Sequence, residues 1–306
     1  MPSGLGGMGS GMTNAVIESA DRAASIWQGA QPGHIRLGSD AHRELFCRLM
    51  LDTFNPYKPA VIDWPKLAAD ERARLVALPI WDIAVQVEGK ARRRMLNYAA
   101  EVKDPLLRQA LELNGFEEGR HKEVLSHLVA AYGIALAPEP DYVAPRDAEW
   151  GYMKTGFSEC IDSFFAFGLF ELARRSGFFP PALVETFEPV MQEECRHILF
   201  FVNWVAWHRR NLPWWQKPIF AVRVLTVWIG LIWERIETAR EAGGHNFAAT
   251  GHQSMGLDAD AADLFAVCLA ENERRMTGYD ERLVRPCVMP IVARAALRLM
   301  RRRARD

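Results

Sequence analysis

Two near-copies of one pentapeptide decide the fold that this sequence predicts: EEGRH at Glu117–His121 and EECRH at Glu193–His197. Each copy places a glutamate and a histidine three residues apart. On a helix such a pair projects from one face and can bind the same metal ion. A single Glu-x-x-His often arises by chance, but four matching letters of five, repeated 76 positions apart, indicate two related helices that face one site. The paired residues are Glu118 with His121, and Glu194 with His197.

The sequence around the pentapeptides predicts two antiparallel helical hairpins joined by a crossover. We expect the four helices at about 80–102, 105–132, 149–175 and 181–208. Asp104 and Pro105 are typical of a helix start, and Gly133 is typical of a helix end. Residues 135–148 contain three prolines and are expected to form the crossover. The predicted class is therefore all-α, with a four-helix bundle core at about 80–208.

Residues equally far from the turn of an antiparallel hairpin lie at the same height, which indicates further metal ligands. In the first hairpin this places Glu88 level with Glu118. In the second hairpin Asp162 fits best by height and Glu159 lies one turn away, and both share a helix face. Height and phase leave the choice between Glu159 and Asp162 open.

The segments outside the core carry weaker signals. Residues 1–38 are expected to form a disordered tail, and 39–306 a single domain. We expect a short helix at about 40–53 with Asp40 as its N-cap, a turn-rich link at 55–65, a loop at 243–256, and helices at 258–277 and from 289 to the end. The tryptophan-rich stretch 214–233 predicts a buried fifth helix, with a membrane contact as the less favoured reading. The basic C-terminus is assigned no function.

Composition restricts the classes of function. The net charge of -1 and the pI of about 6.7 do not favour nucleic-acid binding. The five cysteines are odd in number and have no Cys-x-x-Cys spacing, which is typical of free thiols in a reducing compartment. The Gly-rich N-terminus has neither a basic leader nor an apolar stretch. We therefore expect a cytoplasmic protein.

These residues resemble the ferritin-like diiron carboxylate superfamily over roughly residues 80–208. The pentapeptides are similar to the Asp-Glu-x-Arg-His motifs of bacterial multicomponent monooxygenase hydroxylases and of the ribonucleotide reductase small subunit. The spacing of 35 residues from Glu159 to Glu194 resembles those enzymes and favours Glu159, with Asp162 as an alternative ligand or a hydrogen-bonding neighbour. The resemblance implies a ferritin-like four-helix bundle with a crossover connection. It does not cover either end of the chain, where the local pattern predicts additional helices. The resemblance also implies six metal ligands: Glu88, Glu118, His121, Glu159, Glu194 and His197.

The same families assign a role to the first acid of each pentapeptide, which hydrogen-bonds a ligating histidine. Here these acids are Glu117 and Glu193, one methylene longer than Asp, and Arg120 and Arg196 either neutralise them or form surface pairs. One departure is informative. The reductase has its radical tyrosine where this chain has Leu125, so a tyrosyl-radical reductase is not expected.

The leading functional hypothesis is an oxygen-activating diiron enzyme that oxidises a small organic substrate. Glu118 and Glu194 would bridge two iron ions, with manganese as an alternative metal in either position. Phe164, Phe165 and Phe167 favour an apolar substrate, although most such side chains belong to the core. The partners expected are dioxygen, the substrate and an unidentified electron donor, and a homodimer stays open. The alternatives are a ferroxidase or peroxide-scavenging iron protein, and a helical scaffold that needs no metal.

Overall fold

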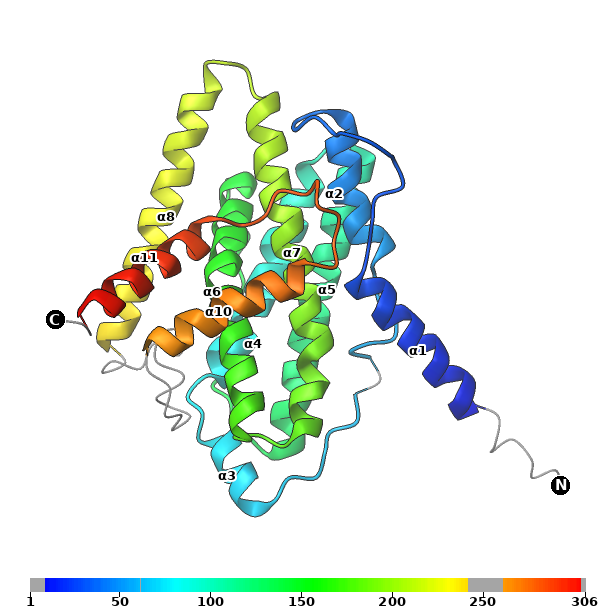
Figure 1. Cartoon of the computed structure of the whole chain (residues 1–306), viewed down its shortest axis with the longest axis vertical. Helices are drawn as coiled ribbons and strands as arrows, with labels where there is room; N and C mark the ends of the chain where they lie inside the picture. Colours follow the sequence, from blue (N-terminus) through cyan, green and yellow to red (C-terminus); the bar gives the residue numbers. More distant parts are fainter. Residues whose placement is uncertain (1–8, 61, 242–260, 304–306) are drawn as a thin grey trace.

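The computed structural model describes residues 9–60, 62–241 and 261–303. Every element within these ranges is a helix, which confirms the predicted all-α class (Figure 1). The helices are α1 Gly9–Ser25, α2 Asp40–Asp52, α3 Ala69–Val76, α4 Trp81–Glu101, α5 Pro105–Tyr132, α6 Ala148–Ser176, α7 Pro181–Asn211, α8 Gln216–Glu241, α10 Ala261–Met276 and α11 Val288–Arg303.

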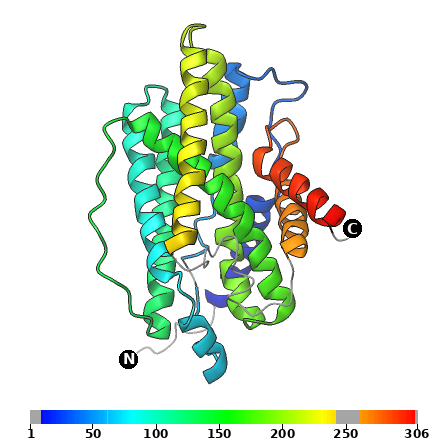
Figure 2. The ribbon, with the colours of Figure 1, turned by 90° about the vertical axis from the view of Figure 1, so that its left-hand side faces the viewer.

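Helices α4 to α7 form the predicted pair of hairpins, and local sequence signals set their ends. The Asp104 side chain accepts a hydrogen bond from the backbone N–H of Leu107 at 2.8 Å and caps α5, with Pro105 in the first turn. Gly133 ends α5 in the left-handed conformation, at φ 67°. Residues 134–147 then run along the outside of the bundle, so that α5 and α6 point in the same direction (Figure 2).

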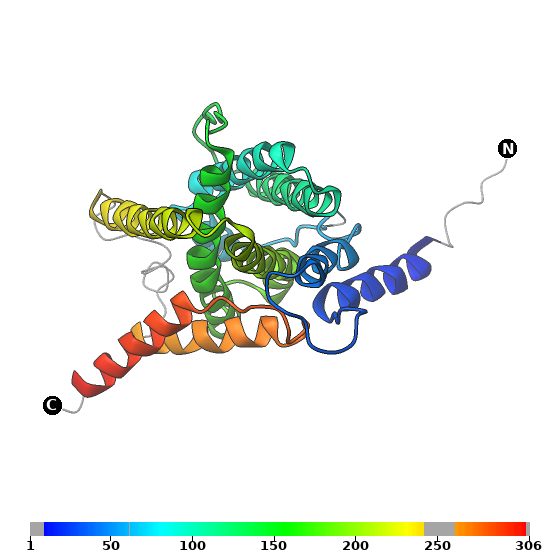
Figure 3. The ribbon, with the colours of Figure 1, turned by 90° about the horizontal axis from the view of Figure 1, so that it is seen from above.

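The remaining helices surround this bundle. Helix α2 packs against α5 and α7, α8 lies beside α6, and α10 lies across α6 (Figure 3). The buried interior is rich in aromatic side chains. Tyr98 and Tyr152 are stacked with ring centroids 4.7 Å apart, and Trp204 meets Tyr152 edge-on at the same distance. Phe164 and Phe167 are part of this core.

The N-terminal prediction was wrong in two respects. The expected tail of residues 1–38 contains α1, which contacts the other end of the chain. The backbone carbonyl of Ala24 accepts a hydrogen bond from the Tyr279 hydroxyl at 2.6 Å. Local sequence patterns cannot predict such a long-range contact. The N-cap of α2 is Ser39 and not Asp40, because the Ser39 hydroxyl oxygen accepts from the backbone N–H of His42.

The tryptophan-rich segment forms α8, but the prediction of a buried helix was wrong. Phe220, Val227 and Leu231 face the bundle, while a second set of large apolar side chains on α8 is exposed. Among the described residues, no helix combines the length and apolar character needed to cross a bilayer. The loop expected at 243–256 lies outside the described residues.

Candidate metal centre

Helices α5 and α7 bring the two pentapeptides together in the middle of the bundle. The side chains of Glu118 and His121 meet those of Glu194 and His197, and one potential ligand atom from each residue lies within 4.8 Å of the others. All four residues are buried. Two carboxylates and two imidazoles gathered in an apolar interior can hold a metal ion.

Each histidine faces the carboxylate of the other pentapeptide. Nδ1 of His121 lies 3.0 Å from Oε1 of Glu194, and Nδ1 of His197 lies 2.9 Å from Oε1 of Glu118. The two imidazole rings are close neighbours, with centroids 5.5 Å apart. The four side chains therefore share one small space that neither helix could form alone.

The first glutamate of each pentapeptide supports the histidine of the other one. Glu193 accepts hydrogen bonds from Nε2 of His121 at 2.8 Å and from Nη2 of Arg120 at 2.6 Å. Because an ionised carboxylate only accepts hydrogen bonds, Nε2 of His121 must carry a proton. The lone pair of the neutral ring then lies on Nδ1, which points into the cluster.

The second half of the network repeats this pattern. Glu117 accepts from Nε2 of His197 at 2.8 Å and from Nη2 of Arg196 at 2.7 Å. Burial alone would raise the pKa of Glu117, but Arg196 and His197 outweigh burial and lower this pKa to about 2. Arg196 is fully buried, so the hypothesis of a surface pair was wrong for this arginine.

The atoms that face the centre of the cluster have no hydrogen-bond partner. They are Nδ1 of both histidines and Oε1 of Glu118. A lone pair on Nδ1 that faces a carboxylate oxygen at about 3 Å is repulsive unless a cation lies between them. In the absence of a metal ion a proton fills this role. Burial lowers the pKa of His197, but Glu118 and Glu117 outweigh burial and raise it to about 10.

Glu88 on α4 and Glu159 on α6 are close enough to the cluster for its charges to shift their pKa values. Oε2 of Glu88 is 3.8 Å from Nδ1 of His121. Both carboxylate oxygens of Glu159 are buried and lack a hydrogen-bond partner. Burial, and then the charges of Glu118 and Glu194, raise the pKa of Glu88 and of Glu159 well above the ordinary value. Two more carboxyl groups are therefore buried where the neighbouring negative charges oppose their ionisation.

Asp162 points away from the cluster. Its oxygens lie 2.7 Å from Nη2 of Arg235 on α8, and it accepts a hydrogen bond from the Ser158 hydroxyl at 2.9 Å. The two positions that sequence analysis left open therefore differ in surroundings: the buried carboxyl group of Glu159 is influenced by the charges of Glu118 and Glu194, whereas Asp162 is paired with Arg235 of α8. The sequence analysis missed Ser163, whose buried hydroxyl donates to Oε2 of Glu194 at 3.3 Å. Its position four residues after Glu159, on the same helix face, was the available signal.

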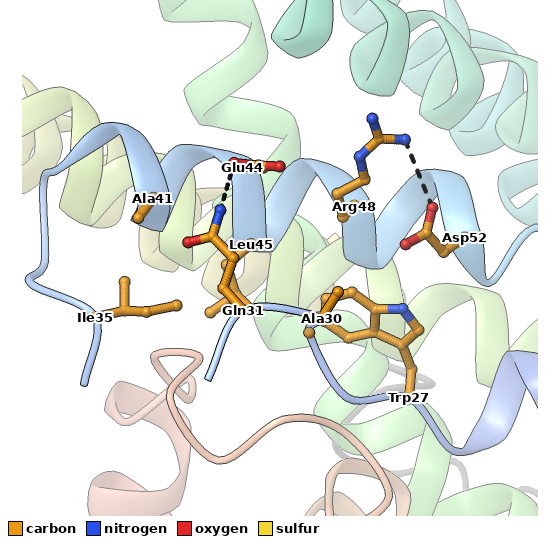
Figure 4. A pocket seen from close by; sticks show the side chains of 10 residues that line it. Trp27, Ala30, Gln31, Ile35, Ala41, Glu44, Leu45, Arg48 and Asp52 are labelled. Atoms are coloured by element: carbon orange, nitrogen blue, oxygen red, sulfur yellow. Dashed lines mark hydrogen bonds and ion pairs between the residues drawn. The ribbon is translucent and has the colours of Figure 1, made fainter. Parts of the chain in front are cut away.

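A separate pocket with a cavity volume of about 170 Å³ lies between α2 and residues 27–35 (Figure 4). Its lining includes Gln31, which donates to Glu44, and Arg48, which pairs with Asp52. None of the cluster residues lines this pocket.

The comparisons with known proteins do not add to this geometry. No protein-family model matches the sequence, and no curated protein or solved structure is significantly similar to it. The side chains of the buried Glu/His cluster are therefore the basis for assigning a function.

Proposed function

We propose that this protein is a ferritin-like diiron oxidoreductase. In this proposal the ligands are Glu88, Glu118, His121, Glu159, Glu194 and His197. The observation that carries the proposal is the buried group of Glu118, His121, Glu194 and His197, whose potential ligand atoms all lie within 4.8 Å of one another. Within and around this group, Nδ1 of both histidines, Oε1 of Glu118 and both oxygens of Glu159 have no hydrogen-bond partner. Such atoms are costly to bury unless a ligand satisfies them.

Charge supports two ions in preference to one. Once metal binding has ionised all four carboxyl groups, they would carry four negative charges, which two divalent cations would neutralise. The first acids of the two pentapeptides need no metal ion to balance their charge, because Glu117 is paired with Arg196 and Glu193 with Arg120. With neutral histidines, two divalent ions would make the buried site electrically neutral. Oxygen and imidazole ligands without thiolates suit iron, with manganese as an alternative.

Several residues of the chain would prepare the site for oxidation chemistry. Glu117 and Glu193 hold the Nε2 protons and so present Nδ1 of each histidine to the metal. Ser163 restricts the orientation of the Glu194 carboxylate through its hydrogen bond. Burial of the cluster excludes bulk water from a reactive centre. Bound iron would supply electrons to dioxygen, and we propose a small, apolar organic molecule as the substrate to be oxidised.

Metal analysis of the full chain tests the first part of this proposal. We expect about two iron ions per chain after anaerobic loading with ferrous iron. The double variant Glu118→Ala/His197→Ala should lose most of this metal. A matched control, Glu112→Ala/His127→Ala, changes one exposed glutamate and one exposed histidine on α5 and should keep it. A metal-free wild-type protein, or equal metal content in both variants, would contradict the proposal and favour a metal-independent scaffold.

Exposure of the ferrous protein to dioxygen tests the second part. We expect rapid oxidation of the bound iron that stops after the loaded equivalents, together with oxidation of added apolar substrates when a reductant is supplied. Continued uptake and oxidation of many ferrous ions per chain would instead assign the protein to iron storage. Catalytic removal of hydrogen peroxide without an organic product would assign it to peroxide scavenging.

A further inference from the structure

Helix α8 is apolar on both of its faces. Phe220, Val227 and Leu231 are at most 3% exposed and pack against the bundle. On the opposite face the large apolar side chains are 42% to 80% exposed. They are Trp214 and Trp215, in the turn directly before α8, and on the helix Ile219, Val222, Leu225, Ile229, Ile232, Trp233 and Ile236. We call these nine residues the outer α8 face. A helix that is apolar all round is normally covered on every side.

The outer α8 face is large enough for a stable protein interface. Taken together, its exposed side chains present on the order of 1,000 Å² of apolar surface, more than the ~300–600 Å² of the largest patch on a typical monomer. A standard interface buries about 800 Å² on each partner. Figure 3 shows α8 at the periphery of the bundle.

The charged side chains of α8 favour a protein partner over a lipid surface. Arg223 pairs with Asp147 at 2.9 Å, and Arg235 pairs with Asp162 at 2.7 Å, both within the chain. Interfacial membrane helices instead present Lys and Arg to the lipid headgroups along a polar face. These arginines of α8 are directed toward its own bundle.

The spacing along the outer α8 face is that of a helix that packs against another helix. Apolar or small residues recur at alternating intervals of four and three, as in a coiled-coil seam. The seam consists of Ile219, Val222, Thr226, Ile229, Trp233 and Ile236. Its one polar member, Thr226, donates its hydroxyl to the carbonyl of Val222 at 2.9 Å. The hydroxyl is therefore satisfied within the helix and needs no partner across the seam.

We propose that the outer α8 face binds α8 of a second copy of this chain, in antiparallel orientation about a two-fold axis. One antiparallel register pairs all six residues of the seam with residues of the second seam. In this register Val222 faces Trp233 of the second copy, and Thr226 faces Ile229 of the second copy. Small residues then meet large ones, as dense packing requires. A parallel pair would place Trp233 against its own copy and leave a gap between the two small Thr226 residues. The interface is isologous, because the same face is used by both chains.

The oligomeric state of the full chain tests this proposal, and it does so whether or not the metal centre is functional. Light scattering coupled to gel filtration should give about twice the chain mass of 34.6 kDa at micromolar concentration. Ile229→Glu should shift the protein to a monomer. The matched control is Ile291→Glu on α11, because Ile291 is 58% exposed and Ile229 is 59% exposed. The control should stay dimeric, and circular dichroism should show both variants folded.

Two results would overturn the proposal. One is a wild-type monomer, for which cosedimentation with vesicles of neutral and anionic phospholipid would then show whether the outer α8 face binds lipid. The other is a dimer that persists unchanged in Ile229→Glu, which would place the interface elsewhere.

Cysteine cross-linking tests the orientation. In a background with the exposed Cys287 changed to Ser, we mix a tagged Ile219→Cys chain with an untagged Ile236→Cys chain. An antiparallel pair should give the mixed disulfide as the main product under mild oxidation. Preferential cross-linking of Ile219→Cys to itself would contradict the antiparallel register.

Discussion

At the scale of single residues, the candidate metal centre depends on reciprocal hydrogen bonds between α5 and α7. Glu117 of the first pentapeptide accepts from His197 and Arg196 of the second, and Glu193 of the second accepts from His121 and Arg120 of the first. Each pentapeptide is therefore incomplete by itself. Loss of one arginine should leave a buried carboxylate on the opposite helix without its counter-ion.

We expect Arg196→Met to lower the free energy of unfolding of the metal-free protein by about 3–5 kcal/mol, because Glu117 then stays buried without its partner. Urea denaturation measures this change. The control is Arg48→Met, because Arg48 lies 3.8 Å from Asp52 in an exposed pair on α2. This control should change stability by no more than about 1 kcal/mol. Equal losses of unfolding free energy in the two variants would show that the hydrogen bonds between the two pentapeptides do not stabilise the protein.

At the scale of elements, α10 packs closely across α6. Gly168 on α6 lies under Cys268 of α10, and a Cβ at this glycine would lie 2.3 Å from Sγ and 3.0 Å from Cα of Cys268. The sulfur could move, but the backbone atoms of Cys268 cannot move without shifting α10. The absence of a side chain at Gly168 therefore determines how closely the two helices approach.

We expect Gly168→Ala to destabilise the protein by about 1–3 kcal/mol through overpacking, although alanine is the better helix former. The same substitution at Gly230 of α8, where a Cβ meets nothing within 4 Å, should raise stability by up to about 1 kcal/mol. Thermal unfolding of both variants in the Ile229→Glu background keeps any dimer from affecting the comparison. A stabilised Gly168→Ala variant would show that α10 adjusts freely over α6.

At the scale of the whole molecule, residues near the two ends of the chain are connected through Asp280. This buried carboxylate accepts a hydrogen bond from the backbone N–H of Gly29 at 2.8 Å and one from Nε of Arg282 at 2.8 Å. The Arg282 hydrogen bond, together with backbone hydrogen bonds, lowers the pKa of Asp280 to about 2. Stability linked to this carboxylate is present above pH 3.8, the ordinary pKa, and is lost as the pH falls toward 2.

We expect this loss to reach about 2 kcal/mol between pH 3.8 and pH 2 in urea denaturation of the metal-free protein. Asp280→Asn should lower stability at neutral pH and flatten this part of the pH profile. The control is Asp52→Asn, because Asp52 lies 3.8 Å from Arg48 in an exposed pair on α2. That variant should keep the slope of the wild type. An unchanged slope in Asp280→Asn would exclude Asp280 as the source of the acid dependence.

Local sequence signals determined the helical class, most helix boundaries and the grouping of residues around the centre. The pentapeptides, the caps at Asp104 and Gly133, and the height of Glu88 in its hairpin could all be read from spacing, because helix geometry is regular. Spacing could not separate Glu159 from Asp162, since they share a helix face. Only the position of Arg235 on α8 shows that Asp162 is directed away from the cluster.

Tertiary structure alone decided the features that join distant parts of the chain. The crossed hydrogen bonds of Glu117 and Glu193, the docking of α1 at Tyr279, and the exposure of one face of α8 all depend on contacts between segments far apart in sequence. A periodic pattern states which residues share a face. It does not state what that face meets, because that depends on the packing of every other helix.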